Sequence, residues 1–392
     1  MSSADGVSPL DGASGAPSLQ RILRRPAEPG MALAQIETPA LLVDLPALDR
    51  NIARLAAYVQ SQSPGVRLRP HAKTHKSPDV ARRQIAAGAV GVCCQTVGEA
   101  EAMAAAGIAD ILLSNQIAGA GKAARLAAIA GQSRLSVCVD DPAQVALLSE
   151  AALAAGVTIH ILVELDVGGA RCGVQSAEAA RALAELVQST PGLGFGGLQA
   201  YHGRAQHMRK PQERKAAIER AILLAGEAAA KIRAAGIACD TVTGAGTGSF
   251  EFEAASALYT ELQCGSYVFM DADYARNERD DTTAMPRFEQ ALTVLTTVIS
   301  TPLPDRAVCD AGLKAMSLDS GPPSLQLHPG LDYAGVSDEH STLTMHAPAT
   351  LRVGQAIHLV PGHCDPTVAM HDWIIVHDGK RVLDVWPVTR GW

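Results

Sequence analysis

The segment 69–76, with the sequence RPHAKTHK, carries two lysines whose amines could each form a Schiff base with an aldehyde. Apolar and basic side chains alternate at its start, which predicts a strand over residues 66–72. Ser77, which precedes a proline, is typical of a helix start. Lys73 is therefore expected at the carboxyl end of a strand and Lys76 in the loop after it. Taken alone, the two lysines also fit an ordinary exposed loop.

The elements around this segment alternate between strand and helix. Alanine-rich helical stretches lie between the strands, and glycine tends to mark their ends, as at Gly107 and Gly236. Eight strands with helical crossovers are what a (β/α)8 barrel requires, and barrel enzymes keep their chemistry at the carboxyl ends of the strands. The expected strands are 66–72, 90–95, 111–114, 135–139, 159–165, 195–201, 241–243 and 262–268.

The pattern changes after residue 285, where β-rich segments at 292–299, 307–310, 356–360 and 373–376 alternate with proline and glycine turns. This predicts a barrel over residues 36–285 and an antiparallel β domain over 286–392. A short strand at 40–43 belongs to one or the other. A doubly wound open sheet is the alternative for the first part, but a GxGxxG motif after an early strand is missing.

Composition and charge narrow the class of protein. The 392 residues are 47% hydrophobic and 19% charged, as in a globular α/β protein, and the net charge of -7 argues against nucleic-acid binding. The eight cysteines lack CxxC spacing and are expected to be reduced thiols in a cytoplasmic protein. Residues 1–35 are expected to form a disordered tail, and we expect no membrane span.

Glycine and hydroxyl residues cluster after the seventh and eighth predicted strands, at 243–249 and 264–266. Many barrels bind a phosphate there, because glycine lets backbone N–H groups approach the oxygens. Together with a lysine at the first strand end, such a phosphate site indicates a cofactor with an aldehyde and a phosphate. Pyridoxal phosphate is that cofactor.

A second group of candidate residues lies in the predicted β domain. His363 and Asp365 are two residues apart in a turn-rich segment, so both could face one ion, although such pairs are also common as purely structural contacts. A carboxylate oxygen suits Mg2+ or Mn2+, whereas Cys364 between them would favour Zn2+.

With these residues identified, the chain resembles the D-threonine aldolase group of the fold type III pyridoxal-phosphate enzymes, from about Glu37 to the C-terminus. This group also includes D-3-hydroxyaspartate aldolase and eukaryotic-type D-serine dehydratase. The most specific matching segments are RPHAKTHK (69–76), GVCCQTVGEAE (91–101), DVGGARCGV (166–174), QAYHG (199–203), TGAGTGS (243–249), ELQCGSYVFMDADY (261–274), SDEH (337–340) and PGHCDPT (361–367).

The resemblance implies a role for individual residues. Lys73 matches the Schiff-base lysine, and His363 and Asp365 match the metal ligands. D-serine dehydratases carry Cys where this chain has Asp365, which favours an aldolase and Mn2+ or Mg2+ over Zn2+. Arg171 matches an arginine near the phenolic oxygen of the cofactor, and Gln263 stands where alanine racemases have an arginine facing the pyridine nitrogen.

The same resemblance, joined to the strand-end positions, suggests the remaining roles. His207, or His363 beside the ion, would act as general base. Candidates for holding the phosphate are Tyr201, Thr247, Gly265 and Ser266.

The expected reaction is the retro-aldol cleavage of a D-β-hydroxy-α-amino acid to glycine and an aldehyde, with pyridoxal phosphate and a divalent cation as cofactors. The alternatives are a 3-hydroxyaspartate aldolase that releases glyoxylate, a D-serine dehydratase and, in a different class, a non-catalytic pyridoxal-phosphate carrier. Only the enzyme hypotheses give a reason for His207, His363 and Asp365 to converge. The resemblance also implies a homodimer that acts on a small molecule.

Overall fold

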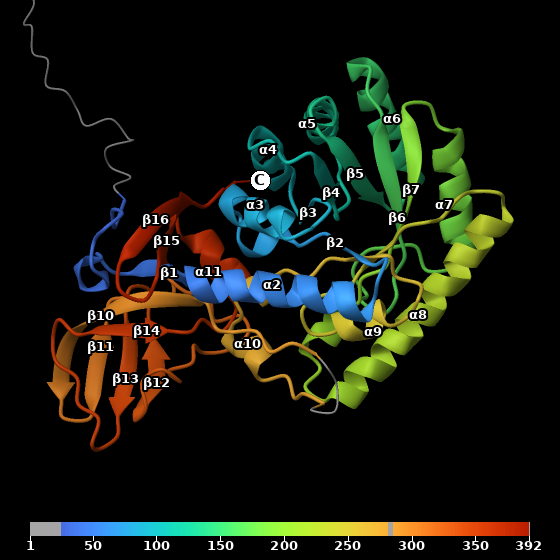
Figure 1. Cartoon of the computed structure of the whole chain (residues 1–392). Helices are drawn as coiled ribbons and strands as arrows, with labels where there is room; N and C mark the ends of the chain where they lie inside the picture. The colour runs from blue at the N-terminus through green and yellow to red at the C-terminus, as the bar shows by residue number, and fades with distance from the viewer. Residues whose placement is uncertain (1–24, 281–284, 392) are drawn as a thin grey trace, which may run out of the picture.

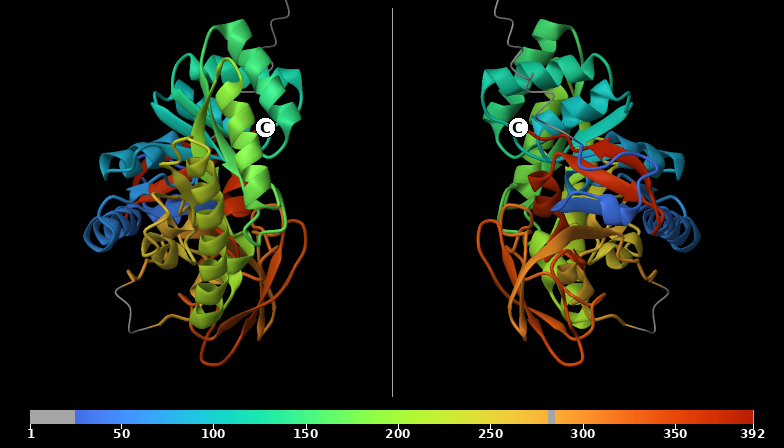
Figure 2. Two further views of the ribbon diagram at one scale, coloured as in Figure 1. Left: turned by 90° about the vertical axis from the view of Figure 1, so that its right-hand side faces the viewer. Right: turned by 90° about the vertical axis from the view of Figure 1, so that its left-hand side faces the viewer.

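Two eight-stranded sheets organise the chain, which a computed structural model describes for residues 25–280 and 285–391. In Figure 1 the barrel lies at the right and the β domain at the lower left, and helix α2 (Leu45–Gln62) crosses the front between them. The two side views in Figure 2 show the orange and red strands of the β domain below and beside the barrel helices. Within the described part of the chain, no helix combines the length and the hydropathy needed to cross a bilayer.

The first sheet is parallel, with the strand order β2-β9-β8-β7-β6-β5-β4-β3. Hydrogen bonds of 2.9 Å from Val90 N to Leu68 O and from Cys93 N to Pro70 O join its two edges and close it into a barrel. The predicted (β/α)8 barrel is thereby confirmed. Its strands are β2 (Arg67–Leu68), β3 (Val92–Cys94), β4 (Asp110–Leu113), β5 (Arg134–Val139), β6 (Ile159–Glu164), β7 (Leu193–Gln199), β8 (Val242–Gly244) and β9 (Glu261–Leu262).

The barrel helices begin and end where local sequence signals place them. Thr96 and Glu99 form a capping box at the start of α4, and Gly107 and Gly236 adopt positive φ just beyond α4 and α8. These helices cover the outside of the sheet (Figure 1). They are α3 (Pro78–Ala86), α4 (Val97–Ala105), α5 (Ala120–Ala130), α6 (Pro142–Ala155), α7 (Ala177–Ser189), α8 (Pro211–Ala234) and α9 (Phe250–Ala254). The short helix α10 (Ala272–Ala275) instead contacts the β domain, where Ala272 N donates to Pro361 O at 2.9 Å.

The second sheet is antiparallel except for one pair, because the early strand β1 (Ala40–Asp44) inserts between β10 and β15 and runs parallel to β15. The remaining elements of the β domain are β10 (Leu292–Leu303), β11 (Arg306–Cys309), β12 (Leu331–Val336), β13 (Ser341–Met345), β14 (Ala356–Leu359), α11 (Cys364–Met370), β15 (Trp373–His377) and β16 (Val382–Pro387). Strands β12, β13 and β16 and helix α11 were not expected from the sequence.

One apolar cluster joins the β domain to the barrel. It contains Leu48 and Leu55 of α2, Leu262 of β9, Leu292 of β10 and Cys364 of α11. A buried surface of this kind is the main favourable term in packing two units together. It holds α11 against the end of the barrel at which the strands terminate.

The structure also differs from the sequence expectations at two predicted strands and in the N-terminal tail. The segments 66–72 and 262–268 form strand over only two residues each, and 3-10 turns follow, since these stretches bend over the barrel end. Most of the predicted disordered tail, residues 1–24, lies outside the described residues. The rest of that tail is ordered: Gly30 N donates to Val382 O at 2.8 Å, and Ala27 is buried against the β domain.

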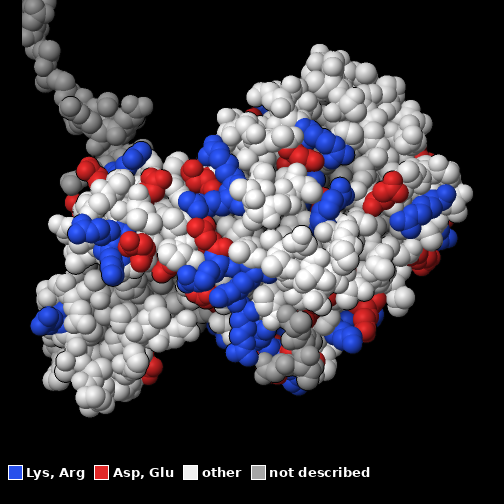
Figure 3. Space-filling view, viewed as in Figure 1, with Lys and Arg blue, Asp and Glu red and all other residues white. Residues whose placement is uncertain are grey.

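The face crossed by α2 carries charges of both signs (Figure 3). Arg50 and Arg54 both pair with Glu289, and Arg83 pairs with Asp49. The positive charge on this face is thus partly compensated by neighbouring carboxylates.

Candidate active site

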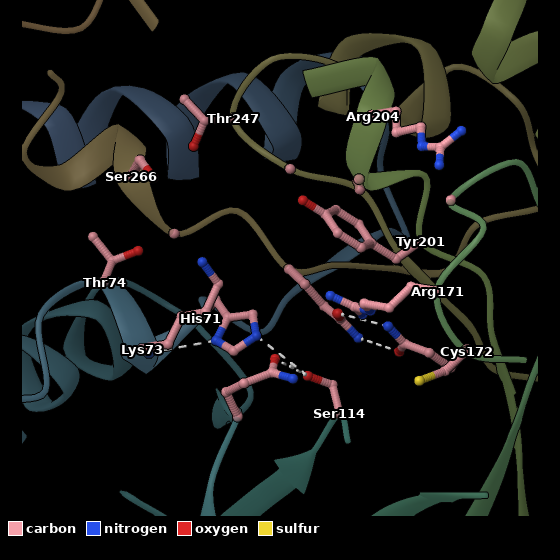
Figure 4. A pocket seen from close by; sticks show the side chains of 18 of the residues that line it. His71, Lys73, Thr74, Ser114, Arg171, Cys172, Tyr201, Arg204, Thr247 and Ser266 are labelled. Carbon is pink, nitrogen blue, oxygen red and sulfur yellow. Dashed lines mark hydrogen bonds between the residues drawn. The ribbon is translucent and has the colours of Figure 1, made fainter. Parts of the chain in front are cut away.

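The carboxyl ends of the barrel strands surround a cavity of about 380 Å³. It lies among the 3-10 turns η2 (Ala72–Thr74), η3 (Gly203–His207) and η4 (Ser266–Val268), which follow β2, β7 and β9. In Figure 4 the Lys73 amine and the Tyr201 hydroxyl point toward the same central space. The residues of the predicted site that line this cavity are Lys73, Arg171, Tyr201, His207, Thr247, Gln263, Gly265 and Ser266.

Lys73 is the second residue of η2, whose N-cap residue is His71. Its amine contacts the carboxylate of Asp365. Burial opposes the charged amine, but the nearby Asp365 carboxylate outweighs burial and raises the pKa of Lys73 above its ordinary value. Lys76 instead pairs with Glu99 of the capping box on α4. Of the two lysines, Lys73 is the one that faces the cavity.

His71 is a buried neighbour of Lys73 that the sequence reasoning did not single out. Burial first, and then the charge of Lys73, lower the pKa of His71 to about 3, so its imidazole is neutral. Its Nε2 lies 3.2 Å from Ser114 Oγ, and its Nδ1 accepts from Lys73 N at 3.4 Å. The ring is therefore held at a fixed position on the floor of the cavity.

Asp365 reaches the Lys73 amine from α11 in the β domain of the same chain, although it does not itself line the cavity. Its Oδ1 lies 3.5 Å from Ser266 Oγ, and Cys364 N donates to Asp271 Oδ2 at 3.0 Å, which ties the start of α11 to the barrel. Burial favours the neutral acid, but Lys73 and then His363 outweigh it and lower the pKa of Asp365 below its usual range. Asp365 is an ionised carboxylate at the junction of the two domains.

His363 has a different hydrogen-bond partner from Asp365, and the predicted turn is the start of helix α11. It is the N-cap residue of α11, and its Nδ1 lies 2.8 Å from Asp319 Oδ2. His363 does not line the cavity itself. Within residues 25–280 and 285–391, no three His, Cys, Asp or Glu side chains gather into a ready metal site. The donor set, one imidazole beside one buried carboxylate, still fits a divalent ion whose other ligands are water or substrate.

His207 lines the cavity from η3 and is held by a carboxylate behind it. Its Nδ1 lies 2.5 Å from Asp273 Oδ2, and Arg209 Nη2 donates to Asp273 Oδ1 at 2.5 Å. Burial opposes ionisation of Asp273, but the hydrogen bonds from Arg209 and His207 keep its pKa below the usual value. An ionised Asp273 beside Nδ1 fixes the orientation of the His207 ring and leaves Nε2 as the nitrogen that would exchange a proton.

Arg171 and Tyr201 lie on the side of the cavity across from Lys73 (Figure 4). The Arg171 guanidinium is 6.0 Å from the centre of the Tyr201 ring, and its Nη2 is 3.8 Å from Glu164 Oε1. Glu164 also accepts from Gln116 Nε2 at 2.7 Å. Arg171 therefore has loose contacts and a half-exposed side chain that is free to meet an anionic group.

Gln263 lies in a buried amide pair below the cavity. Its Nε2 donates to Gln199 Oε1 at 2.7 Å and to Thr243 Oγ1 at 2.9 Å. Gln199 Nε2 in turn donates to Gln263 Oε1 at 3.1 Å. The hydrogen-bonding groups of Gln263 are thus engaged within the barrel, and the group beneath the cavity is neutral.

The predicted phosphate site has the small residues and hydroxyls that such a group needs. A Cβ at Gly265 would lie 2.5 Å from Thr74 Oγ1, so only glycine lets this loop approach η2 so closely. Thr247 Oγ1 accepts from Tyr267 N at 3.0 Å, which fixes its loop beside Ser266. Because the amine of Lys73 and this loop pair line the same cavity, the residues present fit an aldehyde that carries a phosphate.

Several residues that complete the site were missed. His71 could have been noticed within RPHAKTHK, and Gln199 within QAYHG. For Asp273 and Asp319 the sequence holds no clear signal, because each meets its histidine only through tertiary contacts across 66 and 44 residues.

Comparisons with known proteins agree with this architecture. Residues 43–273 match the family model for the alanine racemase N-terminal domain, and residues 291–377 match a serine dehydratase domain model. A D-threonine aldolase from an Arthrobacter species is 46% identical over 93% of this chain and 95% of its own length. A 3-hydroxy-D-aspartate aldolase from Paracoccus denitrificans is 45% identical over 93% of this chain and 94% of its own length.

Solved structures of related enzymes have the same fold. The crystal structure of D-threonine aldolase from Filomicrobium marinum superimposes with a TM-score of 0.90 at 47% identity, and the match covers 93% of this chain and 98% of that one. D-threo-3-hydroxyaspartate dehydratase from a Delftia species has a TM-score of 0.78 at 28% identity, with 92% and 100% covered. The chain therefore belongs to the alanine racemase N-terminal domain family and, within it, to the group that contains D-threonine aldolase and 3-hydroxy-D-aspartate aldolase.

Proposed function

We propose that the protein is an aldolase that uses pyridoxal phosphate and a divalent cation to cleave D-β-hydroxy-α-amino acids of the D-threonine type into glycine and an aldehyde. The observation that carries this proposal is the meeting of three side chains from distant elements. Lys73 and His207 line one cavity, and Asp365 of the other domain contacts the Lys73 amine. The two aldolases that are 46% and 45% identical over nearly the full length support the same reaction.

Lys73 would hold the cofactor through a covalent bond from its Nζ to the aldehyde carbon. Thr247, Gly265 and Ser266 would hold the phosphate, and Arg171 would meet the phenolic oxygen. Tyr201 borders the same space as a further phosphate candidate. When bound, pyridoxal phosphate supplies an electron sink for the pair left at Cα when the Cα–Cβ bond breaks.

His207 would act as the general base. Its Nε2 would take the proton of the β-hydroxyl, the Cα–Cβ bond would then break, and the aldehyde would leave while Cα gains a proton to give glycine. Asp273 holds the opposite nitrogen of the ring at 2.5 Å, which keeps the basic nitrogen directed at the cavity. His363 is the other candidate for this base, but it does not line the cavity, and the ring nitrogen that Asp319 leaves open would bind the cation.

His363 and Asp365 would bind the cation, which would polarise the β-hydroxyl oxygen and lower its pKa. A charge argument links this ion to Lys73. Once Lys73 is bonded to an aldehyde, Asp365 loses the ammonium group that now neutralises it, and a buried carboxylate without a counter-charge is costly. A divalent ion, Mn2+ or Mg2+ rather than Zn2+, would restore the balance.

The reaction is tested by incubating the holoenzyme and Mn2+ with D-threonine, L-threonine and D-serine. The expected products are glycine and acetaldehyde from D-threonine alone. Pyruvate and ammonia from D-serine would instead identify a dehydratase, a possibility raised by the relative that is 31% identical and is a D-threo-3-hydroxyaspartate dehydratase. Release of neither product from any D-β-hydroxy amino acid would favour a cofactor carrier.

The β-substituent separates the two aldolase activities. Parallel assays with D-threonine, a phenylserine and 3-hydroxy-D-aspartate, with glyoxylate as the product of the last, rank the substrates by kcat/KM. A preference of tenfold or more for the dicarboxylate would assign the 3-hydroxyaspartate activity, about 1.4 kcal/mol of discrimination.

We also propose that the protein is a cytoplasmic homodimer. The cytoplasm is supported by its eight cysteines, all of which are free thiols. The dimer follows from the family resemblance. Light scattering of the purified protein measures its mass against the 40.8 kDa of one chain.

A further inference from the structure

The loop after β8, which carries the proposed phosphate ligand Thr247, rests on the buried side chain of Gln206. Gly248 N donates to Gln206 Oε1 at 2.9 Å. A Cβ at Gly246 would lie 2.5 Å from the same oxygen, and one at Gly248 would lie 2.6 Å from the backbone oxygen of Gln206. Both glycines therefore allow the loop to lie directly on Gln206.

The amide of Gln206 is held in one orientation by a short chain of hydrogen bonds. Its Nε2 donates to Ser249 Oγ at 2.7 Å and to His202 O at 3.3 Å, and Ser249 Oγ donates in turn to Glu253 Oε1 at 2.8 Å. Glu253 is 1% exposed, and burial raises its pKa to about 7. Because Gly248 N can only donate and His202 O can only accept, the amide oxygen of Gln206 faces Gly248, and Ser249 accepts from Nε2.

Gln206 also belongs to η3, the turn that carries His207. Its backbone oxygen accepts from Asn277 Nδ2 at 2.8 Å, which joins η3 to the segment after α10. The residue is 0% exposed, and its amide oxygen and nitrogen both have partners. One side chain therefore links the loop that would bind a phosphate to the turn that would supply the base.

We propose that Gln206 is a positioning residue that sets the distance between the phosphate-binding loop and His207, and that Ser249 and Glu253 fix the direction of its amide. This inference rests on the proposed function, because the loop matters only if the phosphate of the cofactor binds there. Gln206 touches neither the substrate nor the cofactor, and it acts through Gly248 and through the backbone of its own turn.

The test compares the affinity of the cofactor-depleted enzyme for pyridoxal phosphate and for pyridoxal, which lacks the phosphate. Gln206→Ala should raise the dissociation constant of pyridoxal phosphate about tenfold or more, because the loop loses its support, and leave that of pyridoxal within about twofold of the wild type. At saturating cofactor, kcat should also fall about tenfold while KM changes little, since His207 is displaced. Absorbance titration and steady-state kinetics measure these quantities.

Three further variants keep the test decisive if Gln206→Ala folds poorly. Ser249→Ala removes a single oxygen and should weaken the binding of pyridoxal phosphate alone, by a few fold. Glu253→Gln retains an acceptor for Ser249 and should bind both compounds as the wild type does at slightly acidic pH. Gln290→Ala makes the same chemical change as Gln206→Ala at a side chain that bonds only to Met270 O and Leu292 O, and should alter neither affinity.

The outcomes separate this inference from the proposed function. A wild type that binds neither compound contradicts both. If the wild type binds pyridoxal phosphate and the Gln206→Ala and Ser249→Ala variants bind it equally well, only the positioning role is contradicted. The same holds if the two variants lose affinity for pyridoxal phosphate and for pyridoxal to the same degree.

Discussion

Two pairings of a cation with carboxylates lie within one short segment, at Arg69 and Lys73, and their surroundings differ. Arg69 points into the barrel, where its Nε and Nη2 donate to both oxygens of Glu261 at 2.7 and 3.2 Å, and its Nη1 donates to Asp110 at 2.8 Å. Its side chain is 5% exposed. Lys73 meets a single carboxylate, Asp365, and its side chain is 38% exposed to the cavity.

The difference shows that ion pairs in this protein have two roles, one in stabilising the barrel and one at the proposed active site. The guanidinium of Arg69 is matched by paired oxygens that are fixed within its own barrel, and the other cations near these carboxylates, Arg67 at 3.7 Å and Arg134 at 3.4 Å, are about half exposed. The pairing of Lys73 and Asp365 joins two domains at a cavity, and each group has a second partner in the proposed function. The first cluster is structural, and the second is a contact that binding would exchange.

The largest effect is expected when Lys73, the cation of the pairing that binding would exchange, is removed. Lys73→Ala should lower the rate of D-threonine cleavage on the order of 10⁴-fold or more and abolish the cofactor absorbance, because no amine remains for the aldehyde. Lys76→Ala is the matched control from the same segment and should keep the absorbance. Absorbance retained by the Lys73 variant would contradict the assignment.

Removal of Arg69, the cation of the structural cluster, should instead affect the stability of the fold. Arg69→Met should lower the free energy of unfolding by about 3–5 kcal/mol, because the buried Glu261 loses its two-bond partner and keeps only the more distant Arg67 at 3.7 Å. Arg134→Met removes the exposed partner of Asp110 and should cost less than about 1 kcal/mol. Urea unfolding of the two variants measures the difference, and equal losses would remove the distinction between the clusters.

The barrel and the place of Lys73 within it could be predicted from the sequence, whereas the ion pairs of Arg69 could not. The alternation of strands and helices predicts the barrel, and Lys73 is expected at a strand end because the segment before it alternates and a helix start follows it. The elements that complete the site were harder to predict. Helix α11 is only seven residues long and follows a proline and glycine turn, so its pattern is too short to give a helical period.

The short strands posed the opposite problem. Residues 262–268 are apolar enough to read as a strand, but the loop that follows β9 bends into η4 so that Ser266 faces the cavity. Local propensity cannot predict such a bend, because it is imposed by the packing of Gly265 against Thr74 and His71. Strand β1 likewise pairs with β10 and β15, which are separated from it by most of the chain.

Removal of the metal should affect the site at Lys73 and Asp365 and leave the Arg69 cluster unchanged. Exhaustive chelation should reduce the cleavage rate on the order of 10²- to 10³-fold while the cofactor absorbance remains, since the ion would polarise the substrate and the covalent bond depends on Lys73. Added Mn2+ should restore the rate, and the urea midpoint should change little. Undiminished activity after chelation would show that Asp365 serves only to pair with Lys73.

The smallest effect is expected at Asp319, which lies behind the exchangeable pair. Asp319 Oδ2 is 2.8 Å from His363 Nδ1, and a carboxylate in that place orients an imidazole so that its Nε2 can bind an ion. Asp319→Asn should therefore weaken Mn2+ binding about 10- to 100-fold, as measured by calorimetric titration. Asp332→Asn alters a comparable aspartate in the same domain, paired with His346 at 2.7 Å, and should leave the Mn2+ affinity unchanged. If both variants bind Mn2+ as the wild type does, His363 is not oriented by Asp319, and the ion site depends on Asp365 alone.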